Sequence, residues 1–162
     1  MTAAATVPDM IEVQLTASDF QLELYVDGYE LPDLDTGPDA NTLACEIELD
    51  LQRRLDLHAA QNQLILRTFE LASFVDQLRT LEHAQDGQAA LGDPHQQSGD
   101  QFGLSIRLHQ EHGTLDGFLT DSDTTRLSFE MINIDRAFVR DALTQFGAII
   151  EAFPVRGDIT AD

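Results

Sequence analysis

Alternating apolar and polar residues predict strands in the first third of the chain. In Ile11–Leu15, Phe20–Val26 and Leu43–Leu51 every second residue is apolar, which is the period of a strand with one buried face. The short polar link TASD joins the first two segments, so they are predicted to form a hairpin. Cys45 falls on the apolar side of the third segment, and we therefore expect it in the core rather than as a reactive thiol.

The period changes between Leu66 and His83. Apolar residues recur there at steps of three and four, which predicts a helix. We expect Thr68 to be its N-cap and Glu70 to lie in the first turn, where a carboxylate favours the helix dipole. The next stretch, 84–101, is rich in Gly, Asp, Gln and Ser, and we interpret it as an exposed loop.

Strands return after residue 101 and lead into a second helix. Phe102–Gln110 alternates, and turns at His112–Gly113 and Asp121–Thr124 separate it from two further strand segments. This pattern predicts a three-stranded antiparallel meander. From Asp135 onward apolar residues recur at steps of four and three, which predicts a helix with one apolar stripe facing the sheet. Asn133 or Asp135 is its expected N-cap.

The order of these elements predicts an α+β fold. We expect an antiparallel β-sheet of about six strands, built from a hairpin and a meander, with two helices packed on it. The elements do not alternate as βαβ units, which argues against a parallel doubly wound sheet. The 162 residues suffice for one domain with a sizeable core. We place that domain at 10–156, between a flexible N-terminus at 1–9 and a C-terminal tail at 157–162.

Charge is the strongest feature of the composition. There are 29 acidic residues against nine basic ones, all nine are arginine, and the formal net charge is −20. Such a charge repels nucleic acid and anionic membranes, so we expect neither as a partner, and it favours a basic partner. A salt-rich habitat, or a general acidic bias of the source's proteins, would explain the same charge without any partner.

Cysteine content and hydropathy predict a location. The single cysteine excludes an internal disulfide and fits a reducing compartment. No apolar run approaches the roughly 18 residues that a membrane helix needs, and the first residues do not resemble a signal peptide. We therefore expect a cytoplasmic protein.

No group of residues predicts catalysis. His109 and His112 lie where a strand enters a turn, so we expect their imidazoles to point to different sides, unlike the helix-borne pair of an HExxH zinc site. There is no GxSxG elbow, Walker loop or GxGxxG sequence. We expect neither an enzyme nor a bound cofactor.

The connection YELPDLDTGPDAN, Tyr29–Asn41, holds four acidic residues and no basic one. Its carboxylates have three interpretations: a surface for a basic partner, a calcium loop, or turn residues that set backbone angles. Asp121 and Asp123 offer a second pair of oxygen ligands for calcium. Neither segment has the glycine and glutamate spacing of an EF-hand loop.

A series of short motifs resembles the WapI-type immunity protein family. Tyr29-x-x-Pro32 precedes the acidic loop, and Asp39-Ala40-Asn41 precedes an alternating strand. L-x-T-F-E-L at Leu66–Leu71 begins a helix, and FGLSIRL and then FPVR at Phe153–Arg156 stand in the later places. The resemblance extends from about Ile11 to Arg156. Thr42 and Phe69 replace tryptophans of the family pattern, so the chain resembles a divergent, tryptophan-free member.

The resemblance implies a non-catalytic protein that neutralises a bacterial toxin by binding it. Together with the net charge it predicts an acidic protein for a basic toxin domain, because opposite charges accelerate association. We expect the contact surface to comprise six carboxylates, in the loop and on the outward side of the next strand: Asp33, Asp35, Asp39, Glu46, Glu48 and Asp50. The alternative is a calcium or small-ligand binding module that uses the same loop.

Overall fold

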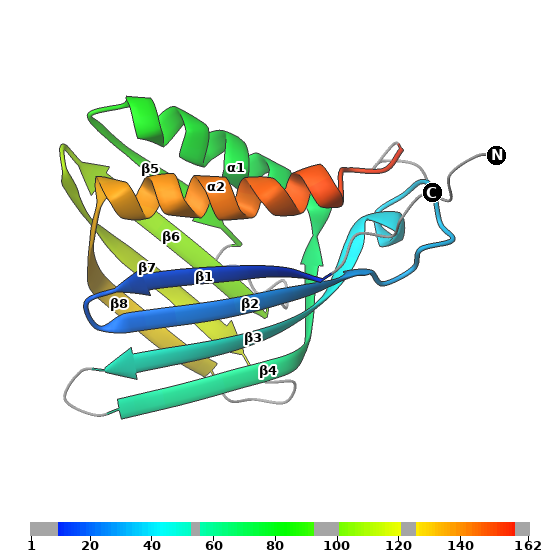
Figure 1. Ribbon diagram of the computed structural model, residues 1–162, viewed down its shortest axis with the longest axis horizontal. Coiled ribbons are helices and arrows are strands. Elements are labelled where there is room, and N and C mark those ends of the chain that lie inside the picture. Colours follow the sequence, from blue (N-terminus) through cyan, green and yellow to red (C-terminus); the bar gives the residue numbers. More distant parts are fainter. Residues whose placement is uncertain (1–9, 53–55, 93–100, 121–125, 158–162) are drawn as a thin grey trace.

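Two antiparallel sheets and two helices make up the computed structural model (Figure 1), which describes residues 10–52, 56–92, 101–120 and 126–157. The described residues form eight strands in two sheets of four, each followed by a helix. The predicted α+β class is confirmed, with eight strands in place of about six. The segments 1–9 and 158–162, and the possible calcium ligands Asp121 and Asp123, lie outside the described residues.

Each half of the chain is a four-stranded meander followed by a helix. The first half contains β1 (Ile11–Ala17), β2 (Phe20–Tyr29), β3 (Thr42–Gln52), β4 (Asp56–Arg67) and α1 (Thr68–His83). The second contains β5 (Asp86–Leu91), β6 (Phe102–His109), β7 (His112–Thr120), β8 (Arg126–Asp135) and α2 (Arg136–Ala152). Within each sheet the strands lie in chain order, and one short 3-10 helix, η1 (Asp39–Asn41), precedes β3.

Two of the strands were not predicted. In β4, Leu64 pairs with Cys45 and Gln61 pairs with Ile47. Asn62 and Gln63 of β4 therefore lie opposite a single residue of β3, which is a β-bulge. This bulge interrupts the alternation of apolar residues. Strand β5 lies inside the stretch 84–101, so the loop predicted there is wrong for residues 86–91.

The ends of the helices partly follow the sequence signals. The Asp135 side chain accepts a hydrogen bond from the backbone N–H of Phe138 at 3.0 Å, which confirms it as the N-cap of α2. The prediction for α1 is wrong, because Arg67 is the N-cap and Thr68 is already helical. Between β6 and β7, the turn is formed by Gln110 and Glu111, two residues before the predicted position at His112 and Gly113.

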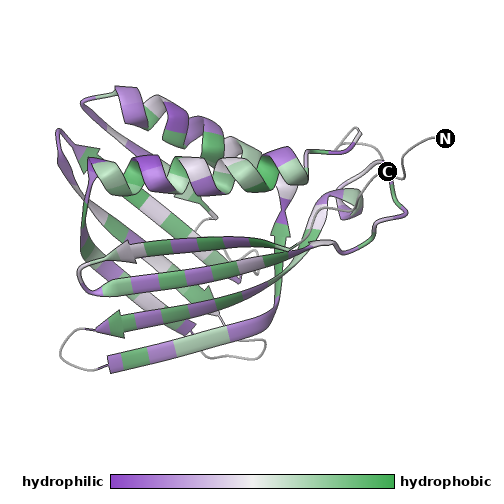
Figure 2. Cartoon of the chain, in the orientation of Figure 1, coloured by the Kyte–Doolittle hydropathy of each residue, from purple (hydrophilic) through white to green (hydrophobic). Residues whose placement is uncertain are grey.

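One hydrophobic core fills the space between the sheets and the helices. The strands of the second sheet run obliquely behind those of the first (Figure 1), and Phe20 of β2 meets Phe129 of β8 with ring centroids 5.2 Å apart. Green and purple segments alternate along β2 and β3 in Figure 2, as expected when one face of a sheet is buried. Cys45 is 2% exposed, which confirms its core position, and burial raises its pKa to about 12.

The two helices lie side by side (Figure 1), and each protects the edge of one sheet. Gln77 of α1 accepts a hydrogen bond from the backbone N–H of Ala90 in β5 at 3.0 Å and donates to its carbonyl at 3.4 Å. Gln145 of α2 does the same for Gln14 in β1, at 2.5 and 2.6 Å. These amides satisfy edge groups that would otherwise be open to another strand. None of the described helices combines the length and apolarity needed to cross a membrane.

Candidate partner-binding site

The acidic connection projects from one end of the molecule. It joins β2 to β3 and lies beside the C-terminal segment (Figure 1), and η1 is its only regular element. Asp33, Asp35 and Asp39 are all exposed. The loop predicted from the sequence is therefore present, and its carboxylates face solvent.

Arg156 holds this loop from inside. Its guanidinium donates to the carbonyl oxygens of Leu31 at 2.9 Å, Pro32 at 2.9 Å and Ala40 at 2.7 Å. The same group lies over the ring of Tyr29, 3.7 Å from the ring centroid. The loop carbonyls therefore surround a cation that the chain itself supplies. The described residues contain no group of three or more His, Cys, Asp or Glu side chains that could hold a metal ion.

Asn41 completes the attachment of the loop. It is fully buried, and its amide donates to the carbonyls of Gly37 and Arg156, both at 3.0 Å. Its carbonyl oxygen accepts from the Thr68 hydroxyl and from the backbone N–H of Arg156, both at 2.7 Å. One side chain thus connects the loop, the start of α1 and the C-terminal segment. Thr68 is buried for this reason, and its hydroxyl serves Asn41 rather than the helix end.

Tyr29 and Phe153 close the same cluster. The Tyr29 hydroxyl donates to the carbonyl of Pro154 at 2.5 Å, and its ring meets Phe153 edge-on with centroids 5.5 Å apart. Burial raises the pKa of Tyr29, against the opposing effect of the nearby Arg156 charge. We refer to Tyr29, Asn41, Thr68, Phe153 and Arg156 as the loop clamp.

The second predicted set of carboxylates lies on the outer side of the first sheet. Glu46, Glu48 and Asp50 alternate with buried residues along β3. Neighbouring strands add Glu12 and Glu23, and Glu23 stands directly opposite Glu48. We call these five side chains the acidic face.

Little positive charge balances the acidic face. Among the described residues that pair with it across β1, β2 and β4, His58 alone can become positively charged. His58 lies 2.6 Å from Asp50, and this hydrogen bond together with the carboxylate charge raises its pKa. Like charges placed directly opposite on a sheet are destabilising. Neutral donors, Gln14, Gln21 and Tyr25, bind Glu12 and Glu23, but no described cation lies across from the Glu23–Glu48 pair, so its charge repulsion is not neutralised.

Tyr25 lies among these carboxylates. It is paired with Glu46 on one side and Glu12 on the other, and its hydroxyl donates to Glu23 at 2.9 Å. The hydrogen bond to Glu23 is the main cause that raises the pKa of Tyr25 to about 12, followed by partial desolvation and by the charges of Glu23, Glu12 and Glu48. The phenol thus stays neutral in the middle of the acidic face.

The six predicted carboxylates form two groups rather than one. The loop carries Asp33, Asp35 and Asp39, and β3 leads away from it, so that Asp50 lies roughly 26 Å from Thr42 at about 3.3 Å per residue. A standard interface covers about 800 Å² per partner, a patch roughly 30 Å across. One partner protein is large enough to touch both groups.

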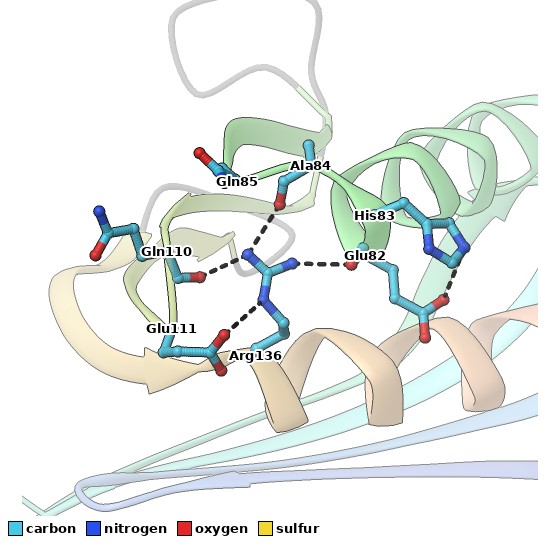
Figure 3. Close-up of a pocket in the computed structure, with 7 residues that line it drawn as sticks. All are labelled: Glu82, His83, Ala84, Gln85, Gln110, Glu111 and Arg136. Carbon is cyan, nitrogen blue, oxygen red and sulfur yellow. Dashed lines mark hydrogen bonds and ion pairs between the residues drawn. The ribbon is translucent and has the colours of Figure 1, made fainter.

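A pocket of about 440 Å³, which sequence reasoning did not identify, lies at the other end of the helices. Figure 3 shows the residues that line it. Arg136 of α2 occupies it and donates to the carbonyls of Glu82 at 2.9 Å, Ala84 at 2.8 Å and Gln110 at 2.6 Å. Glu111 lies 3.6 Å from the same guanidinium. The arginine binds the carbonyls at the end of α1 and the β6–β7 turn, so its role is structural.

The histidines of HQEH have a different arrangement from the predicted one. His109 and His112 are direct partners across the β6–β7 hairpin, so both side chains lie on the same side of the sheet. His109 contacts Asp86 at 2.5 Å. Both histidines are exposed.

Comparison with known proteins identifies the family. The model of the immunity protein WapI-like family matches residues 14–154. The chain belongs to this family. No functionally curated protein matches it.

The motifs that resemble the WapI-like family meet in the loop clamp. Tyr29, Asn41, Thr68 and Arg156 come from four separate stretches of the chain and touch one another through the contacts described above. The motifs therefore fix the loop and the C-terminal segment in place. Apart from Thr68, which was predicted as a helix N-cap, sequence reasoning identified these residues only through the family resemblance. The partners of Arg156 are backbone carbonyls, which the pattern of side chains does not reveal.

Two solved structures of plant proteins show that this WapI-like chain has a known fold. The plant transcriptional regulator PBF-2 aligns with 91% of the chain and 84% of its own length, with a TM-score of 0.53 and 10% identity. WHY1 from Arabidopsis thaliana aligns with 90% of the chain and 92% of its own length, with a TM-score of 0.51 and 10% identity. At this identity the likeness concerns the fold alone.

Proposed function

We propose that this WapI-like protein neutralises a basic bacterial toxin domain by binding it, without catalysis of its own. Membership of the immunity protein family supports the role in toxin binding. The acidic face is the observation that supports a basic partner, because Glu23 and Glu48 stand opposite each other with no arginine among their described neighbours.

The electrostatics of the acidic face favour such a partner. Repulsion between paired carboxylates raises the free energy of the isolated protein by a fraction of a kcal/mol per pair. Lysine or arginine side chains of a partner would relieve this repulsion on binding. Opposite charges also guide the two proteins together and increase the association rate.

The net charge of −20 opposes binding to nucleic acid and to anionic membranes. We therefore infer that the partner is a protein. We also infer that the two proteins bind each other in the cytoplasm. Its contact surface would include Asp33, Asp35 and Asp39 of the loop together with Glu46, Glu48 and Asp50 of the acidic face.

An affinity capture from the lysate of the source organism tests this proposal. The immobilised protein should retain a basic protein at low salt and release it as salt screens the charges. The variant Glu46→Gln, Glu48→Gln, Asp50→Asn should retain much less of this basic protein. The control variant Asp76→Asn, Asp141→Asn, Glu151→Gln removes as much charge from exposed positions on the helices. It should retain the basic protein as the native chain does. Retention of nothing basic, or equal retention by both variants, would contradict the proposal.

A further inference from the structure

Three exposed apolar residues lie on the acidic loop and on the C-terminal segment that is bound to it. Leu31 and Leu34 are each 42% exposed and Val155 is 38% exposed. The backbone N–H of Leu34 donates to the Leu31 carbonyl at 3.2 Å, and Arg156, the neighbour of Val155, donates to the same carbonyl at 2.9 Å. The backbones of the two leucines therefore meet in one turn, and the side chain of Arg156 connects the segment that carries Val155 to the same carbonyl. We call Leu31, Leu34 and Val155 the tip surface.

Carboxylates border the tip surface. Glu30, Asp33 and Asp35 are all exposed and alternate with the leucines along the loop. The guanidinium of Arg156 is bound to this loop, where it donates to the carbonyls of Leu31, Pro32 and Ala40. An apolar centre with a polar, charged rim is the usual anatomy of a protein interface.

The loop clamp holds the tip surface in one arrangement. The Arg156 guanidinium and the Asn41 amide together bind the carbonyls of Leu31, Pro32, Gly37 and Ala40. An irregular loop with this many internal hydrogen bonds loses little conformational entropy when a partner binds. Rigid loops that expose apolar side chains are frequent carriers of binding function.

We infer that the tip surface docks a basic segment of a partner protein in which an apolar side chain is flanked by lysine or arginine. The leucines would contact the apolar side chain, and Glu30, Asp33 and Asp35 would face the cations. The charge of −20 makes a second copy of this chain unsuitable, because both surfaces would repel each other. This inference rests on the proposed function and deepens it by naming the chemistry of the contact.

Two synthetic peptides with equal numbers of lysines test the inference. One carries leucine and phenylalanine between the lysines, and the other carries glycine and serine there. Fluorescence anisotropy at low salt should show about tenfold tighter binding of the apolar–basic peptide, the effect expected from burying roughly one leucine side chain.

Three proteins should be compared with these peptides. The variant Leu31→Ser, Leu34→Ser should lose the preference for the apolar–basic peptide and keep the weak charge-driven binding common to both. The control Leu57→Ser changes a leucine of similar exposure, 45%, on β4, and should behave as the native protein. All three substitutions are at exposed positions and should therefore leave the fold intact.

Equal affinity of both peptides for the native protein, absence of binding, or an unchanged preference in the Leu31→Ser, Leu34→Ser variant would overturn the inference. Failure of the proposed function can be distinguished from failure of this inference. If the capture experiment yields a basic partner while the peptides show no preference, the contact lies on the acidic face. If the peptides show the preference but no basic protein is captured, the tip surface binds basic segments without an immunity role.

Discussion

Replacing Asn41 tests whether the loop clamp stabilises the whole fold. Asn41→Ala removes four hydrogen bonds from a fully buried position. At about 1 kcal/mol each, these bonds predict a loss of about 4 kcal/mol in the free energy of unfolding. For a domain of this size that corresponds to a decrease of roughly 8–16 °C in the melting temperature.

Chemical unfolding followed by far-UV circular dichroism suits a chain without tryptophan. The midpoint in urea should fall at an unchanged m-value, because the variant loses stability without a change in the surface exposed on unfolding. Thr68→Val removes only one of the four bonds and should lose about 1 kcal/mol. Asn133→Ala, at an exposed position on β8, should stay within about 0.5 kcal/mol of the native protein.

A loss below about 1 kcal/mol for Asn41→Ala would refute the reasoning, since it would mean that water or neighbouring groups replace the amide without penalty. Asn41→Asp provides a further check. It preserves the shape and the acceptor but has no donor for the carbonyls of Gly37 and Arg156. We expect it to be destabilising although the side chain is nearly isosteric.

Three further predictions concern titration, thiol reactivity and surface charge. The pKa of Tyr25 is raised to about 12, so absorbance at 295 nm should show that Tyr25 is largely un-ionised at pH 11 in the folded protein, and Glu23→Gln should lower the pKa of Tyr25. The pKa of Tyr25 in the folded protein lies above its ordinary value of 10.0. Its contribution to stability is therefore complete below pH 10 and is lost as the pH rises through about 12. A pKa of 10 for Tyr25 in the folded protein would contradict this prediction. Cys45 should not react with a thiol reagent until the protein unfolds, since it is buried and its pKa is about 12; rapid labelling of the native protein would be inconsistent with that position. Glu48→Gln removes the repulsion with Glu23 and should increase stability by about 0.5 kcal/mol in low salt, and a loss of stability would show that the paired carboxylates do not repel.

The sequence predicted those elements whose pattern stays regular. Leu43–Leu51 alternates without interruption and lies within β3, whereas β4 went unrecognised because its bulge at Asn62 and Gln63 shifts the apolar residues by one position. Strand β5 has only two buried residues, and pairing with β6 and the amide of Gln77 hold it in place. Such partners come from elsewhere in the chain, and local composition does not show them.

The candidate site was predictable to a similar degree. The outward direction of Glu46, Glu48 and Asp50 followed from the alternation along the strand. The role of Arg156 did not, because it binds carbonyl oxygens of residues more than 100 positions earlier in the chain. The family motif marked its position, and only the fold shows the contacts that explain the motif.

Growth of cells that express the captured basic protein tests the central claim most directly. The proposed immunity role predicts that the captured protein arrests growth when expressed alone and that co-expression of the native chain restores growth. The variant Glu46→Gln, Glu48→Gln, Asp50→Asn should restore it poorly, and the helix-surface control Asp76→Asn, Asp141→Asn, Glu151→Gln should restore it fully. A captured protein without toxicity, or toxicity that the native chain does not relieve, would contradict the claim.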